Sequence, residues 1–182
     1  LEPNEIIITL RTPLGQIDNH LENVKERWKL DTVVLDAGHG GKDPGAVGKY
    51  GTKEKDVVLD ITKRAGALLE KSGIRVVYTR DEDVFIPLLE RTKIANDSNG
   101  KVFVSIHTNA NQNRKVQGFE TFLLRPGKSE DAIEVASREN SVISLEEITD
   151  QYEELTGEAL IMATMAQSTF MKESEDLASI IQ

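Results

Sequence analysis

The fold is decided by Thr32-Val33-Val34-Leu35-Asp36 and by the glycine-rich loop that follows, from Gly38 to Gly51. A continuous apolar run of this kind is typical of a strand buried on both faces of a parallel sheet. Downstream, the pattern predicts helices and strands in alternation, over residues 56–72, 75–79, 87–98, 102–106 and 118–124. This alternation indicates an α/β fold: a mostly parallel, twisted sheet with helices on both faces and right-handed crossovers.

Apolar periodicity predicts which side of the first helix packs on the sheet. We expect one face of that helix to carry Val57, Ile61, Ala65, Leu68 and Leu69, because these positions recur at helical spacing. After residue 126 the chain is predicted to be helical to its end, over 129–142, about 145–155 and 158–182.

Composition excludes several classes of protein. The chain has 182 residues and a formal charge of −9, which disfavours nucleic-acid binding because phosphate contacts need clustered Lys and Arg. Cysteine is absent, so thiol nucleophiles and cysteine zinc sites are excluded. Because the sequence starts at Leu1 rather than Met, we expect it to be processed, with a leader lost. Residues 1–30, with a short strand at 5–10, are predicted to be the end of a preceding region plus a linker.

Two of the three histidines fall at the carboxyl ends of predicted strands. His39 follows the first strand, His107 ends the third, and Glu54 immediately precedes the first helix, whereas His20 is expected on the surface. The carboxyl ends of parallel strands meet at one edge, so these three side chains can converge. Two imidazoles and one carboxylate with an open fourth position form a catalytic zinc set. Histidines at strand ends also serve as hydrogen-bonding or structural residues, and spacing alone leaves that alternative open.

The glycine-rich loop has a second possible role as a phosphate-binding loop, because it follows a strand and precedes a helix. Its residues match neither nucleotide motif: Asp43 breaks the dinucleotide register, and Tyr50 stands where a P-loop needs Ser or Thr. A nucleotide-binding function is therefore disfavoured. The glycines instead suggest that the backbone approaches a substrate closely while His39 points inward.

Several segments together resemble a known family. The chain resembles the zinc-dependent N-acetylmuramoyl-L-alanine amidases of the Amidase_3 family, in the family's order. The matching segments are 34–46 (VLDAGHGGKDPGA), 53–56, 79–81, 87–91, 95–96, 105–110 and 118–121. The resemblance implies that His39, Glu54 and His107 bind Zn²⁺. It also implies cleavage of the amide between N-acetylmuramic acid and L-alanine in peptidoglycan. Substrate-binding or supporting residues implied by the same pattern are Arg91, Asn96, Asn109 and Glu120.

Residues of about 127–157 form an insertion that resembles the regulatory segment of the Gram-negative cell-division amidases. That resemblance implies a periplasmic enzyme that is held inactive by a helix of the insertion and switched on by a LytM-domain activator. A glutamate from the helix would fill the fourth zinc position. Glu139 is the first candidate, with Glu146 and Glu147 as alternatives.

The family's final strand, with its catalytic general-base glutamate, has no match, and we expect that residue to lie beyond Gln182. The amidase domain is therefore expected over residues 31–182, C-terminally incomplete, after the tail of an AMIN-like targeting region. The alternative function is a non-catalytic module that binds zinc and peptidoglycan.

Overall fold

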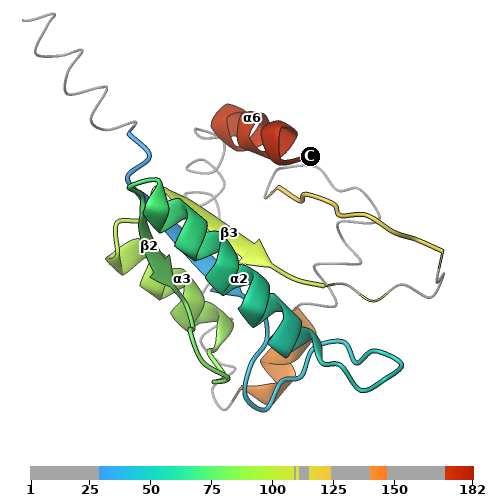
Figure 1. Cartoon of the computed structure of the whole chain (residues 1–182). Helices are drawn as coiled ribbons and strands as arrows, with labels where there is room; N and C mark the ends of the chain where they lie inside the picture. The colour runs from blue at the N-terminus through green and yellow to red at the C-terminus, as the bar shows by residue number, and fades with distance from the viewer. Residues whose placement is uncertain (1–28, 109, 111–114, 124–139, 147–170) are drawn as a thin grey trace, which may run out of the picture.

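The computed structural model describes residues 29–108, 110, 115–123, 140–146 and 171–182. Its centre is a three-stranded parallel sheet in the order β2-β1-β3 (Figure 1). The strands are β1 (Thr32–Ala37), β2 (Arg75–Tyr78) and β3 (Val102–Ile106). In the parallel register, Val34 lies beside Val77 on one side and Phe103 on the other.

β1 is the core of the molecule. All six of its residues are buried, and Val34 and Ala37 are completely inaccessible. A strand with neighbours on both edges and helices on both faces has no solvent-facing side, which explains why its apolar run shows no alternation. The prediction of a strand buried on both faces of a parallel sheet is confirmed.

The helices lie on both sides of the sheet, as predicted. In Figure 1, α2 (Glu54–Lys71) crosses in front of the sheet and α3 (Leu88–Asp97) lies behind it. α2 links β1 to β2, and α3 carries the chain back across β1 to β3. This arrangement brings the carboxyl ends of β1 and β3 and the start of α2 to one edge.

The predicted packing face of α2 is wrong in part. Ile61 and Leu68 are 41% and 65% exposed, and the stripe that α2 buries is Val58, Thr62 and Gly66. Small side chains let the helix approach the sheet closely: a Cβ on Gly66 would lie 1.8 Å from the Tyr78 hydroxyl oxygen. The Thr62 hydroxyl donates to the Val58 carbonyl oxygen at 2.6 Å, so its burial leaves no polar atom unpaired.

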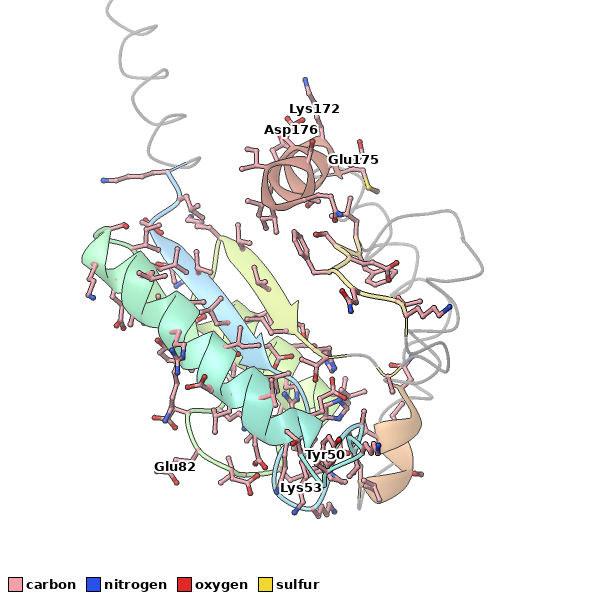
Figure 2. All side chains as sticks on the ribbon, turned by 45° about the vertical axis from the view of Figure 1, so that its right-hand side comes forward. Tyr50, Lys53, Glu82, Lys172, Glu175 and Asp176 are labelled. Atoms are coloured by element: carbon pink, nitrogen blue, oxygen red, sulfur yellow. The ribbon has the colours of Figure 1, made fainter. Side chains whose placement is uncertain are left out.

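Among the described residues after β3, the structure departs from the predicted elements at 118–123 and at 141–146. Residues 118–123 form no strand, although a strand was predicted over 118–124. A short 3-10 helix, η1, spans Ser141–Leu145, and α6 (Met171–Ile181) lies within the helix predicted over 158–182. Figure 2 shows Lys172 and Asp176 on the side of α6 that faces away from the sheet.

Several predictions fall on residues outside the described part of the chain. They concern the segment 1–28 with His20, Asn109, and most of the insertion with Glu139 and Glu147. Within the described residues, no helix has the length and apolar character needed to span a bilayer.

Candidate metal centre

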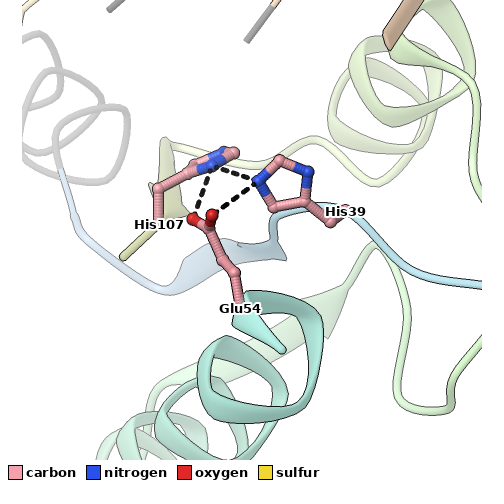
Figure 3. A group of neighbouring side chains, drawn as sticks. All are labelled: His39, Glu54 and His107. Atoms are coloured by element: carbon pink, nitrogen blue, oxygen red, sulfur yellow. Dashed lines mark hydrogen bonds and ion pairs between the residues drawn. The ribbon is translucent and has the colours of Figure 1, made fainter. Parts of the chain in front are cut away.

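Three side chains converge at the carboxyl edge of the sheet. His39 follows β1, His107 follows β3, and Glu54 is the first residue of α2. One ligand atom from each lies within 4.8 Å of the other two (Figure 3). The predicted convergence of His39, Glu54 and His107 is therefore present.

The donor atoms face one another closely. Nε2 of His39 lies 3.3 Å from Glu54 Oε2 and 3.2 Å from Nδ1 of His107, which is 3.5 Å from Glu54 Oε1. When they are unprotonated, the two ring nitrogens and the Glu54 carboxylate around one point would offer three electron pairs to a single cation. Two imidazole nitrogens and one carboxylate oxygen are ligands that Zn²⁺ takes in catalytic sites, so the residues fit this metal.

His39 is oriented by Asp43. Its Nδ1 lies 2.7 Å from Asp43 Oδ2, and the other carboxylate oxygen of Asp43 accepts the Gly45 N–H at 3.0 Å. When the His39 imidazole is neutral, a carboxylate on Nδ1 keeps the proton there, so that the bare Nε2 faces the centre. Asp43 is thus a supporting residue that the sequence analysis did not identify, although it lies four residues after His39 in the same loop.

Glu54 is held in its ionised form. Oε1 accepts the Thr108 N–H at 2.6 Å and Oε2 accepts the Ala46 N–H at 2.9 Å. Burial alone would raise the pKa of Glu54, but hydrogen bonds from His107, His39 and these two backbone groups outweigh it and lower the pKa far below its usual range. For His39, burial lowers the pKa, while hydrogen bonds to Glu54 and Asp43 raise it, with a net upward shift. The site is therefore anionic when both imidazoles are neutral, which suits a dication.

Glycines make the close approach of the ligands possible. A Cβ on Gly38 would lie 2.4 Å from a His107 ring carbon, and a Cβ on Gly45 would lie 2.6 Å from His39 and 2.8 Å from Glu54. His39 itself has a φ of 60°, in the left-handed region that costs a non-glycine residue about 1–2 kcal/mol. The glycine-rich loop therefore shapes the backbone around the ligands.

A buried polar network lies beneath the ligands. Asp36 accepts hydrogen bonds from Thr79 (2.5 Å), Ser105 (2.6 Å) and Arg91 (2.7 Å). Burial raises the pKa of Asp36, but the Arg91 charge and these three hydrogen bonds outweigh it, so the pKa is lowered. Asp36 thereby joins the strand before His39 to β3.

Two buried arginines hold the backbone of the His39 turn. Arg91 donates to the carbonyl oxygens of Ala37 and His39, each at 2.8 Å. Arg80 donates to the carbonyl oxygens of Ala37 (2.9 Å) and Gly38 (2.7 Å). The carbonyls of three consecutive residues are thus fixed by side chains from outside the loop.

Of the other predicted site residues that the structure describes, Arg91 supports the His39 turn through its hydrogen bond to the His39 carbonyl oxygen. Asn96 and Glu120 are exposed, and Arg91 is buried in the network just described. Oε1 of Glu146 accepts the Leu88 N–H at 3.0 Å, at the start of α3. Asn109, Glu139 and Glu147 lie outside the described residues.

A second polar cluster, not predicted, joins the glycine-rich loop to the segment after β2. The buried Lys55 Nζ donates to the Gly41 carbonyl oxygen at 2.9 Å and to Asp83 at 2.6 Å, and the Gly41 N–H donates to Asp83 at 2.8 Å. These bonds fix the loop on the side away from β3.

Comparison with known proteins identifies relatives of this chain. The N-acetylmuramoyl-L-alanine amidase AmiC of Escherichia coli is 52% identical over 93 residues, which are 50% of this chain and 22% of AmiC. AmiA of Escherichia coli is 44% identical over 110 residues, 59% of this chain and 38% of AmiA. The chain thus spans less than half the length of these relatives. The solved structure of the amidase AmiC2 of Nostoc punctiforme matches 47% of this chain and 48% of its own, with 51% identity and a TM-score of 0.45.

A family model covers most of the sequence. The model Amidase_3, whose description is N-acetylmuramoyl-L-alanine amidase, matches residues 33–182. The match begins in β1 and includes His39, Glu54 and His107. This chain belongs to the Amidase_3 family of N-acetylmuramoyl-L-alanine amidases.

Proposed function

We propose that the protein is a zinc-dependent peptidoglycan hydrolase. It cleaves the amide between the lactyl group of N-acetylmuramic acid and the L-alanine of the stem peptide. The observation that carries this proposal is the convergence of His39, Glu54 and His107 within 4.8 Å. The family match over residues 33–182 supplies the substrate class.

Each residue of the centre has a role in this proposal. His39 Nε2, His107 Nδ1 and a Glu54 oxygen hold the metal, and Asp43 keeps the His39 proton on Nδ1. When bound, zinc supplies a Lewis acid that polarises a carbonyl and lowers the pKa of water. Backbone N–H groups at residues 46 and 108 hold the Glu54 carboxylate in place, so the ligands are ordered before the substrate arrives.

Hydrolysis of purified sacculi tests the reaction. The chain, and a version extended past Gln182, are incubated with sacculi and zinc, and new L-alanine amino termini are counted. We expect their release by the extended protein, and its loss after chelation or in His107→Ala. An Arg64→Gln variant, altered on the exposed face of α2, should keep wild-type activity. If the extended protein releases no new L-alanine amino termini, with or without an activator, the proposed amidase activity is refuted.

We also propose that the insertion of about 127–157 regulates this centre. A helix of the insertion places a glutamate, first Glu139 and otherwise Glu146 or Glu147, at the fourth coordination position. A fourth protein ligand excludes the water that the reaction needs. One oxygen of Glu146 accepts the Leu88 N–H at 3.0 Å, and this contact supports an anchoring role for the end of η1 on α3.

Activation then requires removal of the helix, by a LytM-domain protein in the periplasm. Deleting residues 127–157 should raise basal hydrolysis and abolish the response to the activator domain. A substitution of Glu139 by Gln should have the same effect if that residue is the inhibitory ligand. Unchanged basal activity after the deletion would reject autoinhibition but would not contradict the proposed amidase activity.

A second candidate function is a module that binds zinc and peptidoglycan without hydrolysis. It is favoured by one observation: Glu54 and Asp43, the carboxylates of this site within the described residues, both accept hydrogen bonds from backbone and imidazole groups. Neither is free to move a proton. Stoichiometric zinc and retention on sacculi, without new amino termini from any version of the chain, would support this module.

A further inference from the structure

Arg80 connects the two halves of the metal centre through the backbone. Its side chain is buried, with 3% of the residue exposed. Nη2 donates to the Gly38 carbonyl oxygen at 2.7 Å and to the Lys55 carbonyl oxygen at 2.9 Å. Gly38 immediately precedes His39, and Lys55 immediately follows Glu54. A single nitrogen therefore bridges the peptide group immediately before His39 and the peptide group one residue beyond Glu54, although His39 and Glu54 are fifteen positions apart in the sequence numbering.

Other contacts join the loop to α2, but at a greater distance from His39. The Glu54 N–H donates to the Ala46 carbonyl oxygen at 2.9 Å, and the Lys55 N–H donates to Pro44 at 3.2 Å. Both acceptors lie five or more residues after His39 along the loop. The Lys55 ammonium reaches the Gly41 carbonyl oxygen, two residues after His39, and Arg80 joins the peptide group immediately before His39 to the first turn of α2.

The hydrogen bonds of Arg80 all go to backbone carbonyls within the described residues, those of Ala37, Gly38, Lys55 and Glu82. Burying the charge of Arg80 beside a second arginine costs free energy. Burial, and then repulsion from Arg91, lower the pKa of Arg80. Only a guanidinium offers several N–H groups in a rigid, planar fork, and a lysine at this position could not reach the same acceptors together.

We propose that Arg80 is a positioning residue that sets the separation between His39 Nε2 and the Glu54 carboxylate. The inference rests on the proposed metal centre. Zinc binds imidazole nitrogen and carboxylate oxygen at about 2.0–2.2 Å, so a small shift of either peptide misplaces a ligand. Through the clamp on Gly38 and Lys55, Arg80 holds both ligands at a spacing that one ion can bridge.

Metal affinity tests this role without reference to hydrolysis. Arg80→Lys and Arg80→Gln are prepared in the full chain, together with Val34→Ala, which opens a cavity in β1 away from the ligands. Zinc affinity is measured by competition with a chromophoric chelator, and thermal midpoints are recorded with and without zinc. The visible absorption of bound Co²⁺ reports coordination geometry.

We expect both Arg80 variants to bind zinc about 10- to 100-fold more weakly than the wild type, with altered Co²⁺ bands. Lysine should not restore the affinity. Val34→Ala should lower the metal-free midpoint but keep wild-type zinc affinity. Wild-type affinity in Arg80→Lys and Arg80→Gln would overturn the inference, as would equal weakening in Val34→Ala.

Two further outcomes also decide the question. If the metal-free Arg80 variants both fail to fold, Arg80 is a residue of general stability and the inference is wrong. If the wild-type chain itself binds no zinc, the proposed function fails first, and this result is distinct from a wild-type centre that is indifferent to Arg80.

Discussion

Replacing Asp43 by Asn tests whether the centre depends on the protonation of His39. Asp43 accepts two hydrogen bonds, from His39 Nδ1 at 2.7 Å and from the Gly45 N–H at 3.0 Å. Asparagine has one acceptor and one donor at these two positions. With its oxygen towards Gly45, the amide NH₂ faces Nδ1 and forces the imidazole proton onto Nε2, where the metal binds. With its oxygen towards His39, two N–H donors face each other at Gly45.

Either arrangement weakens metal binding. Loss of such a carboxylate partner costs about 10- to 100-fold in metal affinity, which is about 1.4–2.7 kcal/mol. Because zinc binds the folded state, the same amount is lost from the stabilisation by saturating zinc. For a chain of this size about 1 kcal/mol shifts the melting midpoint by about 2–4 °C. The midpoint rise produced by zinc should therefore shrink by about 3–11 °C.

The assay is a zinc titration by chelator competition, paired with thermal unfolding with and without zinc. Asp60→Asn is the matched control, because it removes the same charge from an exposed position that pairs with Arg64 on α2. We expect Asp60→Asn to behave as the wild type. If Asp43→Asn binds zinc within about threefold of the wild type, the orientation of His39 does not depend on Asp43 and the reasoning is refuted.

Three further predictions follow from the packing, the buried network and the metal. Gly66→Ala should lower the free energy of unfolding in urea by about 1–3 kcal/mol, because its Cβ would meet the Tyr78 hydroxyl. Gly48→Ala, where the nearest contact of the added Cβ is 3.5 Å, should be tolerated. Equal losses in the two variants would contradict the close packing of α2. Asp36→Asn should cost about 3–5 kcal/mol because it leaves the buried Arg91 without its carboxylate. The pKa of Asp36 is lower in the folded chain than the value of about 3.9 in unfolded chains, so the stabilisation from its ionised form is complete above that pH and is lost as the pH falls towards the folded pKa. Urea midpoints between pH 7 and 3 should therefore fall more steeply in the wild type than in Asp36→Asn. Parallel curves for the two proteins would contradict this prediction. Chelation should lower the thermal midpoint and added zinc should restore it, and an unchanged midpoint would count against a metal in this centre.

The sequence was sufficient to predict the parallel sheet and the convergence of His39, Glu54 and His107. Val33, Val34 and Leu35 form an uninterrupted apolar run that is typical of a strand covered on both faces, and this predicted the burial of β1, whereas its central place in the order β2-β1-β3 came from the structure. Once β1 and β3 are parallel neighbours, the positions of His39 and His107 at their ends follow from the topology. Glu54 follows for the same reason, since a crossover helix starts at that edge.

The packing of α2 could not be predicted in the same way. Periodicity ranks side chains by hydrophobicity and therefore selected Ile61 and Leu68, which are exposed. The helix instead presents Thr62 and Gly66 to the sheet, because small residues permit a short distance between the two layers. That preference depends on the volume of Tyr78 across the interface, and one helix considered alone does not contain this information.

The residues that support the site were predicted only in part: Arg91 was among the supporting residues implied by the resemblance, whereas Arg80 and Asp43 were missed, for a different reason. Arg80 and Arg91 bind backbone carbonyls of residues 37–39, and every residue type has a carbonyl. No sequence pattern marks such acceptors. Asp43 could have been suspected as a carboxylate four residues after a ligand histidine, but its contact depends on the left-handed turn at His39.

The parallel pairing of β3 with β1 has a consequence for the order of events in folding. His107 joins His39 across 68 positions only when this ladder has closed, and a long-range pairing of this kind forms slowly. In a partly folded chain with β1, α2 and β2 in place, His39 and Glu54 would be positioned, but the third proposed ligand, His107, would not. Zinc should therefore stabilise the fully folded domain, slowing its unfolding while leaving its folding rate almost unchanged.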